Sequence, residues 1–372
     1  MKQLRVLFVR SFALALLLGL TACTPPPEVT AALKDHSGGL ETRLDTVVPW
    51  LLQTHHVPGA SIAVVRKGEV VLAKGWGVTR DGGDRLTANT VFEAASLGKP
   101  LFAYAVMKLV RDGQLDLDKP LGDYLGRRYL ENDDRVLRVT ARHALSHSGG
   151  FPNWRPHHWK DNPGPLKMIF EPGTRFQYSA EGYGYLQATV EKLTGETLEA
   201  FMQRSLLKPL GMSRSTYAWT PAWNGAYAVP HGMFGQAKTK KVNRTHAAAS
   251  LHTTAADFGR FLAAMQGQVP TGQRDAALQT VWLSRMLDSQ MDITEPFTWA
   301  LGWGLEKRSE GTVFWHWGDN IGFQNFVVGS PETGTAVVVL TNGWHGVRIY
   351  RPIVRMVIGH DLNALSSPFL PY

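Results

Sequence analysis

The stretch Glu93-Ala-Ala-Ser96-Leu-Gly-Lys99-Pro100 leads into an apolar run over residues 101–110. Proline is tolerated near helix starts but not in helix interiors, so the run predicts a helix that begins close to Ser96. Ser96 and Lys99 are three residues apart and would share one helix face, with the amine within reach of the hydroxyl. Unpaired amides and the positive dipole end at a helix start stabilise an oxygen that gains negative charge.

This spacing suits a nucleophilic serine with a lysine as its general base. A free lysine has a pKa of about 10.4, so Lys99 must be desolvated or held beside another cation to lose its proton at neutral pH. An N-cap serine beside a solvated lysine is the simpler alternative, because Ser-x-x-Lys alone is a degenerate pattern. Other stretches of the chain are needed to decide between the two.

The first residues have the features of an export signal. Three basic residues precede an apolar run over residues 11–20, which is too short for a stop-transfer helix. The run ends in Leu20-Thr21-Ala22-Cys23, which resembles the lipobox of bacterial lipoproteins, and Cys23 is the only cysteine of the chain. We expect residues 1–22 to be a signal peptide and Cys23 to be lipidated, with a plain cleaved signal as the alternative. The resemblance to lipoproteins without an aspartate after the cysteine implies the inner leaflet of the outer membrane, facing the periplasm.

The composition is that of a globular protein. The chain has 372 residues, of which 44% are hydrophobic and 19% charged, enough for one large domain or two intermingled ones. The formal net charge is +8, but three of the bases lie in the signal and the rest are spread out. An exported protein rarely meets nucleic acid, so we expect no such partner. Residues 23–39 begin with a proline run and predict an extended tether.

Strand patterns occur near both ends of the chain and helical patterns between them. A glycine turn at Lys67-Gly68 separates two β-rich runs, which predicts a hairpin. The pattern predicts an α/β (α+β) fold, with one antiparallel sheet built from both chain ends, covered by helices, and an α-rich insertion beside it. The folded domain is expected over residues 40–365, with 40–98 and 290–365 as the sheet subdomain and 99–289 as the mainly helical one. The predicted strands near the end of the chain are 312–317, 323–328 and 335–340.

Two more stretches carry chemical groups. Phe176-Gln-Tyr178-Ser179-Ala180 lies before a predicted helix, where a phenol can relay a proton; a half-buried core tyrosine is the alternative. His316-Trp317-Gly318-Asp319 ends a predicted strand, and its glycine would let a ligand approach the backbone. There His316 would present a hydrogen-bond donor to a substrate; a surface histidine on an edge strand is the alternative.

Three of these motifs occur in one order, Ser96-Leu-Gly-Lys99, Tyr178-Ser-Ala180 and His316-Trp-Gly318. The set resembles the β-lactamase-related serine hydrolases, which include class C β-lactamases, D,D-peptidases and esterase relatives. The resemblance covers about residues 42–360 and implies the β-lactamase/transpeptidase-like fold. Flanking stretches match as well: Gln114-Leu-Asp-Leu-Asp118, His147-Ser-Gly149-Gly150, Pro209-Leu-Gly-Met212, Thr254-Ala-Ala-Asp257 and Gly302-Trp-Gly304.

The resemblance implies a role for each group. Ser96 would attack an acyl carbon, while Lys99 and Tyr178 would share its proton and pass one to the leaving group. The backbone amides of Ser96 and Asp319, just after Gly318, would form the oxyanion hole, and water would release the acyl group. The chemistry requires no cofactor and no metal.

Two departures narrow the substrate. Ala180 stands where the family commonly has an asparagine that grips the substrate's amide side chain. His316 and Trp317 stand where β-lactamases carry the Lys-Thr pair that fixes a carboxylate, and histidine is only partly charged at neutral pH. Both changes favour an ester or a D-amino-acid amide, from a small molecule or peptidoglycan, over a β-lactam. A β-lactamase, a D,D-carboxypeptidase and a non-catalytic cell-wall ligand-binding protein remain alternatives.

Overall fold

The structure is a computed structural model that describes residues 24–367, except residues 36, 159, 221–222, 224, 240–243 and 268–277. The expected signal peptide and Cys23 lie outside the described residues. In the described part of the chain, no helix combines the length and hydrophobicity that a membrane span requires.

One antiparallel sheet of eight strands forms the centre of the molecule, in the order β2-β1-β10-β9-β8-β7-β6-β5. The predicted hairpin is confirmed as β1 and β2, and β1 then pairs with β10 from the other end of the chain, with Ala60 opposite Thr341. The prediction of one sheet built from both chain ends is therefore confirmed. Its strands are β1 (Gly59–Arg66), β2 (Glu69–Gly77), β5 (Met291–Thr294), β6 (Phe297–Trp299), β7 (Gly304–Arg308), β8 (Gly311–Asn320), β9 (Phe323–Ser330) and β10 (Thr335–Thr341).

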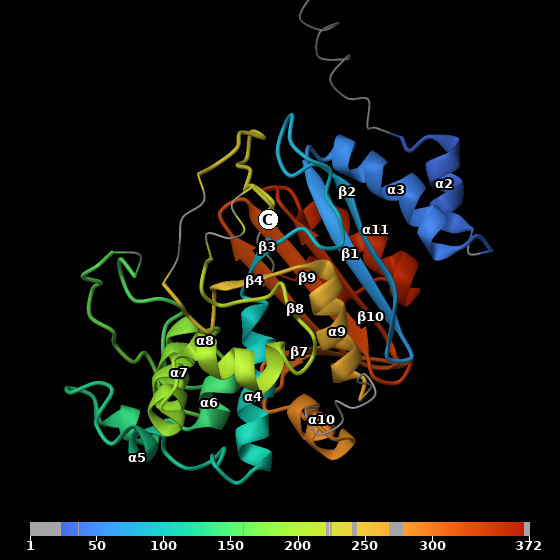
Figure 1. The fold of residues 1–372 in the computed structure, drawn as a ribbon. Coiled ribbons are helices and arrows are strands. Elements are labelled where there is room, and N and C mark those ends of the chain that lie inside the picture. Colours follow the sequence, from blue (N-terminus) through green and yellow to red (C-terminus); the bar gives the residue numbers. More distant parts are fainter. Residues whose placement is uncertain are drawn as a thin grey trace, which may run out of the picture.

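Alternating side chains of the central strands enter two separate cores. In β1, Ile62 and Val64 belong to the core under α3 (Leu40–Thr54) and α11 (Val347–Ile358). Ala63 and Val65 point the other way, into the core shared with α4 (Gly98–Arg111) and α9 (Ala255–Met265). This period of two explains why residues 62–65 of β1 are all apolar, since both faces of the strand are buried there. Figure 1 shows α9 in front of the sheet and α11 behind it.

Further helices lie beside α4, and a small second sheet joins distant parts of the chain. β3 (Phe92–Ala95) pairs with β4 (Leu251–Thr253) and so fixes the residues before Ser96. The remaining helices are α2 (Pro27–Lys34), α5 (Leu121–Leu125), α6 (Ala141–Leu145), α7 (Ala180–Thr194), α8 (Leu198–Met202), α10 (Thr280–Leu287) and the short η1 (Asp134–Arg138), η2 (Gln203–Leu207) and η5 (Asn363–Ser366).

Two boundary predictions need correction. The prediction of an extended tether over residues 23–39 is wrong for Pro27–Lys34. These residues form the helix α2, and its Val29 is buried in the core under α3. Pro27 occupies the first helical turn, where its missing N–H costs nothing, so the prolines begin a helix here. The division at residues 99–289 is also too simple, because Gly259 of α9 packs directly on Ala63 of β1. Among the residues that the structure describes, the helical region shares one core with the sheet.

Candidate active site

Ser96 lies in the turn between β3 and α4, as its sequence predicted. It is the only residue between Val91 and Leu109 that is not buried. The preceding residue, Ala95, has a φ of 53°, a left-handed conformation that costs a non-glycine residue roughly 1–3 kcal/mol. The Ser96 backbone N–H has no acceptor among the described residues. The turn therefore presents both a hydroxyl and a free amide at one exposed point.

Lys99 lies beneath that hydroxyl and is only 1% exposed. Its Nζ donates to Ser96 Oγ at 3.0 Å and to the Ala248 carbonyl oxygen at 2.9 Å, and lies 4.6 Å from the centre of the Tyr178 ring. Burial lowers the pKa of Lys99 well below its usual value. The neutral amine that a general base requires is thus favoured by the site itself.

Tyr178 closes the other side of Lys99, in the loop before α7. Its Oη is buried and has no hydrogen-bond partner among the described residues. Burial raises the pKa of Tyr178, and the nearby Ser96 hydroxyl offsets part of that rise, so the phenol keeps its proton at neutral pH. Trp317 stacks on the ring, with centroids 4.8 Å apart. The structure therefore brings Ser96, Lys99 and Tyr178 together.

His147, for which the sequence motifs predict no role, supports the loop that contains Tyr178. Its Nδ1 accepts the Ser179 N–H at 3.0 Å, and its backbone oxygen accepts the Gln177 N–H at 2.8 Å. The imidazole is 1% exposed and its centre lies 4.3 Å from that of the Tyr178 ring. His147 thus holds the backbone on both sides of the phenol. Its motif, His147-Ser-Gly149-Gly150, matches the family in sequence, but that match alone does not assign a role to the histidine.

We expect His147→Ala to lower both stability and turnover. The change leaves a buried cavity and an unpaired Ser179 N–H, which together cost about 2–5 kcal/mol of unfolding free energy. His147→Asn is the matched variant, because its Oδ1 can replace Nδ1 as acceptor and asparagine tolerates the φ of 58° found here. Denaturant melts and kcat should place the asparagine variant between alanine and wild type. Wild-type kcat in His147→Ala would contradict the supporting role.

His316 lies beside Tyr178 but differs from expectation. It is 0% exposed, and its Nδ1 lies 2.7 Å from the Trp317 carbonyl oxygen, which can only accept. Nδ1 therefore carries the proton and Nε2 is a buried acceptor with no partner among the described residues. Burial is the main cause that lowers the pKa of His316 to about 3. The expectation of a partly charged donor to the substrate is therefore wrong, because the ring is neutral and inaccessible.

The end of β8 is held against the Ser96 turn. A Cβ on Gly318 would lie 2.1 Å from the Ala94 carbonyl oxygen, so only glycine permits this approach. Asn320 adds hydrogen bonds to the Glu93 carboxylate and to the Ala249 carbonyl oxygen. Pairing of β7 with β8 stops at Trp315, while β9 continues to Asn320. Beyond Trp315, the strand that contains Asp319 thus has one edge without β7 beside it.

Ala180 is buried and begins α7, with no polar atom on its side chain. The side chains of the neighbouring Ser179 and Glu181 cannot supply the missing polar atom, because both are already bound to other groups. Ser179 Oγ caps the helix by accepting the Gly182 N–H and donates to Pro152. Glu181 is buried and forms an ion pair at 2.6 Å with the half-buried Arg155.

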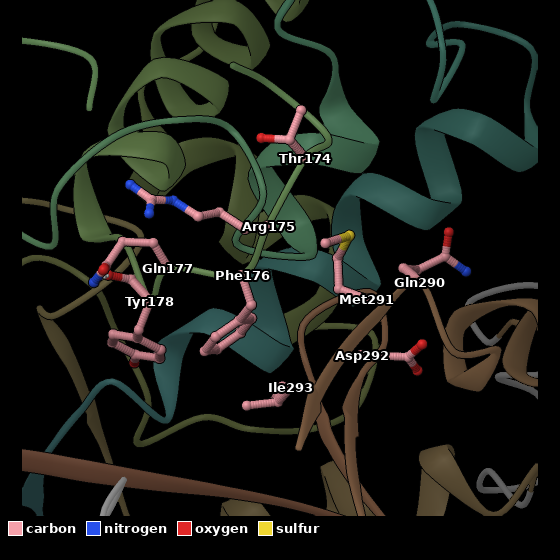
Figure 2. Close-up of a pocket in the computed structure, with 9 residues that line it drawn as sticks. All are labelled: Thr174, Arg175, Phe176, Gln177, Tyr178, Gln290, Met291, Asp292 and Ile293. Carbon is pink, nitrogen blue, oxygen red and sulfur yellow. Dashed lines mark hydrogen bonds between the residues drawn. The ribbon is translucent and has the colours of Figure 1, made fainter. Parts of the chain in front are cut away.

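A cavity of about 760 Å³ opens beside Tyr178, between the loop before α7 and the edge strand β5. Figure 2 shows Phe176 and Tyr178 directed toward the side of the loop where Ile293 lies. Phe176, Met291 and Ile293 give the cavity an apolar side, and its polar lining comprises Thr174, Arg175, Gln177, Gln290 and Asp292. Tyr178 is the one group of the predicted catalytic set that lines it. Among the residues that the structure describes, no group of three or more histidine, cysteine, aspartate or glutamate side chains is placed to hold a metal ion.

Comparison with known proteins assigns the chain to a class. Residues 44–357 match the β-lactamase family, so the chain belongs to that family. It is 24% identical over 324 residues to Protein flp of Staphylococcus aureus, which covers 81% of this chain but 63% of that protein. It is 31% identical over 202 residues to Esterase EstB of Burkholderia gladioli, covering 47% of this chain and 51% of the esterase.

Solved structures agree on the fold. A β-lactamase/D-alanine carboxypeptidase from Pseudomonas syringae superimposes with a TM-score of 0.73 at 18% identity, covering 87% of this chain and 99% of that one. A class C β-lactamase in complex with cefoxitin gives 0.74 at 19% identity, covering 86% and 98%. The expected β-lactamase/transpeptidase-like fold is confirmed.

Proposed function

We propose that this chain is an exported, lipid-anchored serine hydrolase that cleaves esters or D-amino-acid amides through an acyl-enzyme on Ser96. The observation that carries the proposal is the 3.0 Å hydrogen bond between Lys99 Nζ and Ser96 Oγ, made by a lysine whose burial favours the neutral amine. Such a pair supplies a nucleophile and its base within one turn of the chain.

In the proposed reaction Lys99 takes the Ser96 proton as Oγ bonds to the acyl carbon. The oxyanion is held by the Ser96 N–H and by a backbone amide at the open edge of β8, at Asp319. Tyr178 passes a proton to the leaving group as that bond breaks. Water then attacks the acyl-enzyme, with the same groups taking and returning its proton, and the acid product leaves.

Substrates without a recognition carboxylate are favoured. A lysine at position 316 would give a positive charge to bind one, whereas His316 is neutral and buried. The apolar side of the cavity beside Tyr178 suits a substrate with an apolar flank. Esterase activity also agrees with the similarity to Esterase EstB. Because several structural relatives are named as β-lactamases or D-alanine carboxypeptidases, these activities are the second candidates.

Steady-state turnover of three substrate types tests the proposal: p-nitrophenyl esters, nitrocefin and a D-alanyl-D-alanine peptide. We expect the highest kcat/KM for the esters and at least a tenfold lower value for nitrocefin. A higher kcat/KM for nitrocefin or for the peptide would contradict the proposed preference for esters and would favour the second candidates. No turnover and no labelling by a fluorophosphonate would favour a non-catalytic ligand-binding protein.

Anchoring is tested with the full-length chain expressed in a bacterium that processes lipoproteins. We expect the wild-type protein in the detergent phase of a Triton X-114 partition and Cys23→Ala in the aqueous phase, because a diacylated cysteine supplies most of the membrane affinity. Cys23→Ala should retain esterase activity, since the site lies in the folded domain. Equal partition of both proteins would contradict lipidation.

A further inference from the structure

A second cavity, of about 440 Å³, lies between the sheet and the helices α9 and α10. Its volume is within the range of about 300–1,000 Å³ found for small-molecule sites. Ser96, Lys99 and Tyr178 are not among the described residues that line it. In Figure 1, α10 lies near the lower end of α4, whereas β3, which leads to Ser96, lies near its upper end. The cavity is therefore separate from the active site.

The floor of this second cavity is a row of side chains on three adjacent strands. Thr298 of β6 is paired with Leu305 of β7, which is paired with Phe314 of β8. Paired residues of an antiparallel sheet project from the same face, so these three side chains lie side by side. The walls are apolar, with Met265 from the end of α9 and Leu283 and Leu287 from α10. A small apolar molecule would thus contact apolar groups of both the sheet and the helices.

Two polar groups in this apolar setting have no hydrogen-bond partner among the described residues. Thr298 is only 4% exposed, and its Oγ1 is buried and unpaired. Its neighbours Phe297 and Trp299 belong to the core on the other face of the sheet, so the Thr298 side chain projects toward the cavity. Gln266, at the end of α9, also lines the cavity, and its Nε2 is likewise buried and unpaired. The cavity thus offers two unused polar side chains to a ligand.

These two groups and the charges around them define the chemistry of the ligand. A threonine hydroxyl both donates and accepts, and a glutamine amide carries a donor and an acceptor whose positions no hydrogen bond fixes here. An amide on the ligand has both kinds of group and complements either orientation. The charged residues of the lining, Asp288, Lys307 and Glu332, are all exposed, so a charge held deeper in the cavity would be buried without a partner. An uncharged ligand is therefore favoured.

We propose that this cavity is a second ligand site, which binds an uncharged molecule with an apolar body and one amide group. The apolar body lies between Leu305 and Phe314 on one side and the helix side chains on the other. The amide is bound by Thr298 Oγ1 and by the side-chain amide of Gln266. Each of these hydrogen bonds corresponds to about 3- to 10-fold in affinity. The site goes beyond the hydrolytic function proposed above, because it uses none of the proposed catalytic residues.

The test uses 4-phenylbutyramide as the probe, titrated by isothermal calorimetry into the Ser96→Ala chain so that the amide is not consumed. We expect saturable binding with one equivalent. The Kd should be about 3- to 10-fold weaker when Thr298→Val removes the hydroxyl at nearly the same shape, and again when Gln266→Met removes the amide. Gln53→Met is the matched control, because Gln53 is exposed on α3, and its Kd should equal that of the Ser96→Ala parent. The acid of the same shape, 4-phenylbutyrate, should bind about tenfold or more weakly.

Equal Kd values in the parent, Thr298→Val and Gln266→Met would overturn the proposal, since the amide would then bind elsewhere, for example in the cavity beside Tyr178. No saturable binding at millimolar concentrations would overturn it too, and tighter binding of the acid than of the amide would overturn the uncharged class. Thermal melts check that both variants fold. Because binding is measured without turnover, a failure to hydrolyse esters would contradict the proposed function and leave this ligand site unaffected.

Discussion

Ser96→Ala is expected to lower kcat/KM for p-nitrophenyl esters by a factor of about 10⁴ or more. The hydroxyl oxygen of Ser96 forms the bond to the acyl group. Among the described residues, Ser96 is the only hydroxyl to which Lys99 Nζ donates a hydrogen bond, so no other can replace it. The fold should tolerate the change, because Ser96 is partly exposed and its side chain takes no part in the cores. Stopped-flow release of p-nitrophenol measures both the burst and the steady rate.

The control for Ser96→Ala is its thermal melt, which should lie close to that of wild type. Loss of activity with a preserved melt assigns the effect to chemistry. Retention of more than a tenth of the wild-type kcat/KM would show that another group is the nucleophile.

Lys99→Met is expected to reduce turnover by about 10²–10⁴-fold and to raise stability. Methionine fills the same apolar space without a charge, whereas a buried ammonium must be desolvated. Burial lowers the pKa of Lys99 in the folded state below its unfolded value. Between these two pKa values the unfolded chain binds more protons, so wild-type stability rises with pH through that window. The gain from Lys99→Met should therefore be largest at pH below the folded pKa.

The same lowered pKa sets the pH dependence of activity. The base must be neutral, so kcat/KM should fall as pH decreases through the Lys99 pKa and level off above it. Lys108→Met is the matched control, because Lys108 is also buried on α4 but donates to Ser205, away from Ser96. We expect full activity in Lys108→Met. Equal activity losses in the two variants, or no pH dependence in wild type, would contradict the role of Lys99 as base.

Much of the fold could be predicted because the pattern of apolar residues is local. The hairpin at Lys67-Gly68 and the three late strands follow from β-rich runs and turn residues, and the structure has them close to the predicted bounds. α2 was missed because a proline run favours extended geometry unless a partner covers it, and the burial of Val29 under α3 depends on tertiary packing.

The active site, too, could be predicted from the sequence only where its contacts are local. The Ser96–Lys99 pair is one turn apart, so sequence spacing alone predicts its contact. His147 and Asn153 act through hydrogen bonds to the backbone around Tyr178 and Ala180, 27–32 residues further along the chain, which no spacing rule reveals. The neutral state of His316 depends on its burial and on the Trp317 carbonyl oxygen, and both require the fold.

The central claim is that the acyl group passes through Ser96. Rapid acid quench of the full chain during turnover of p-nitrophenyl butyrate, followed by intact mass and peptide mapping, measures this directly. We predict a mass increase of one butyryl group, located on the peptide that contains Ser96 and absent from Ser96→Ala. An acyl group mapped to any other residue, or esterase turnover with no acyl group trapped on the protein while Ser96→Ala remains active, would contradict the account.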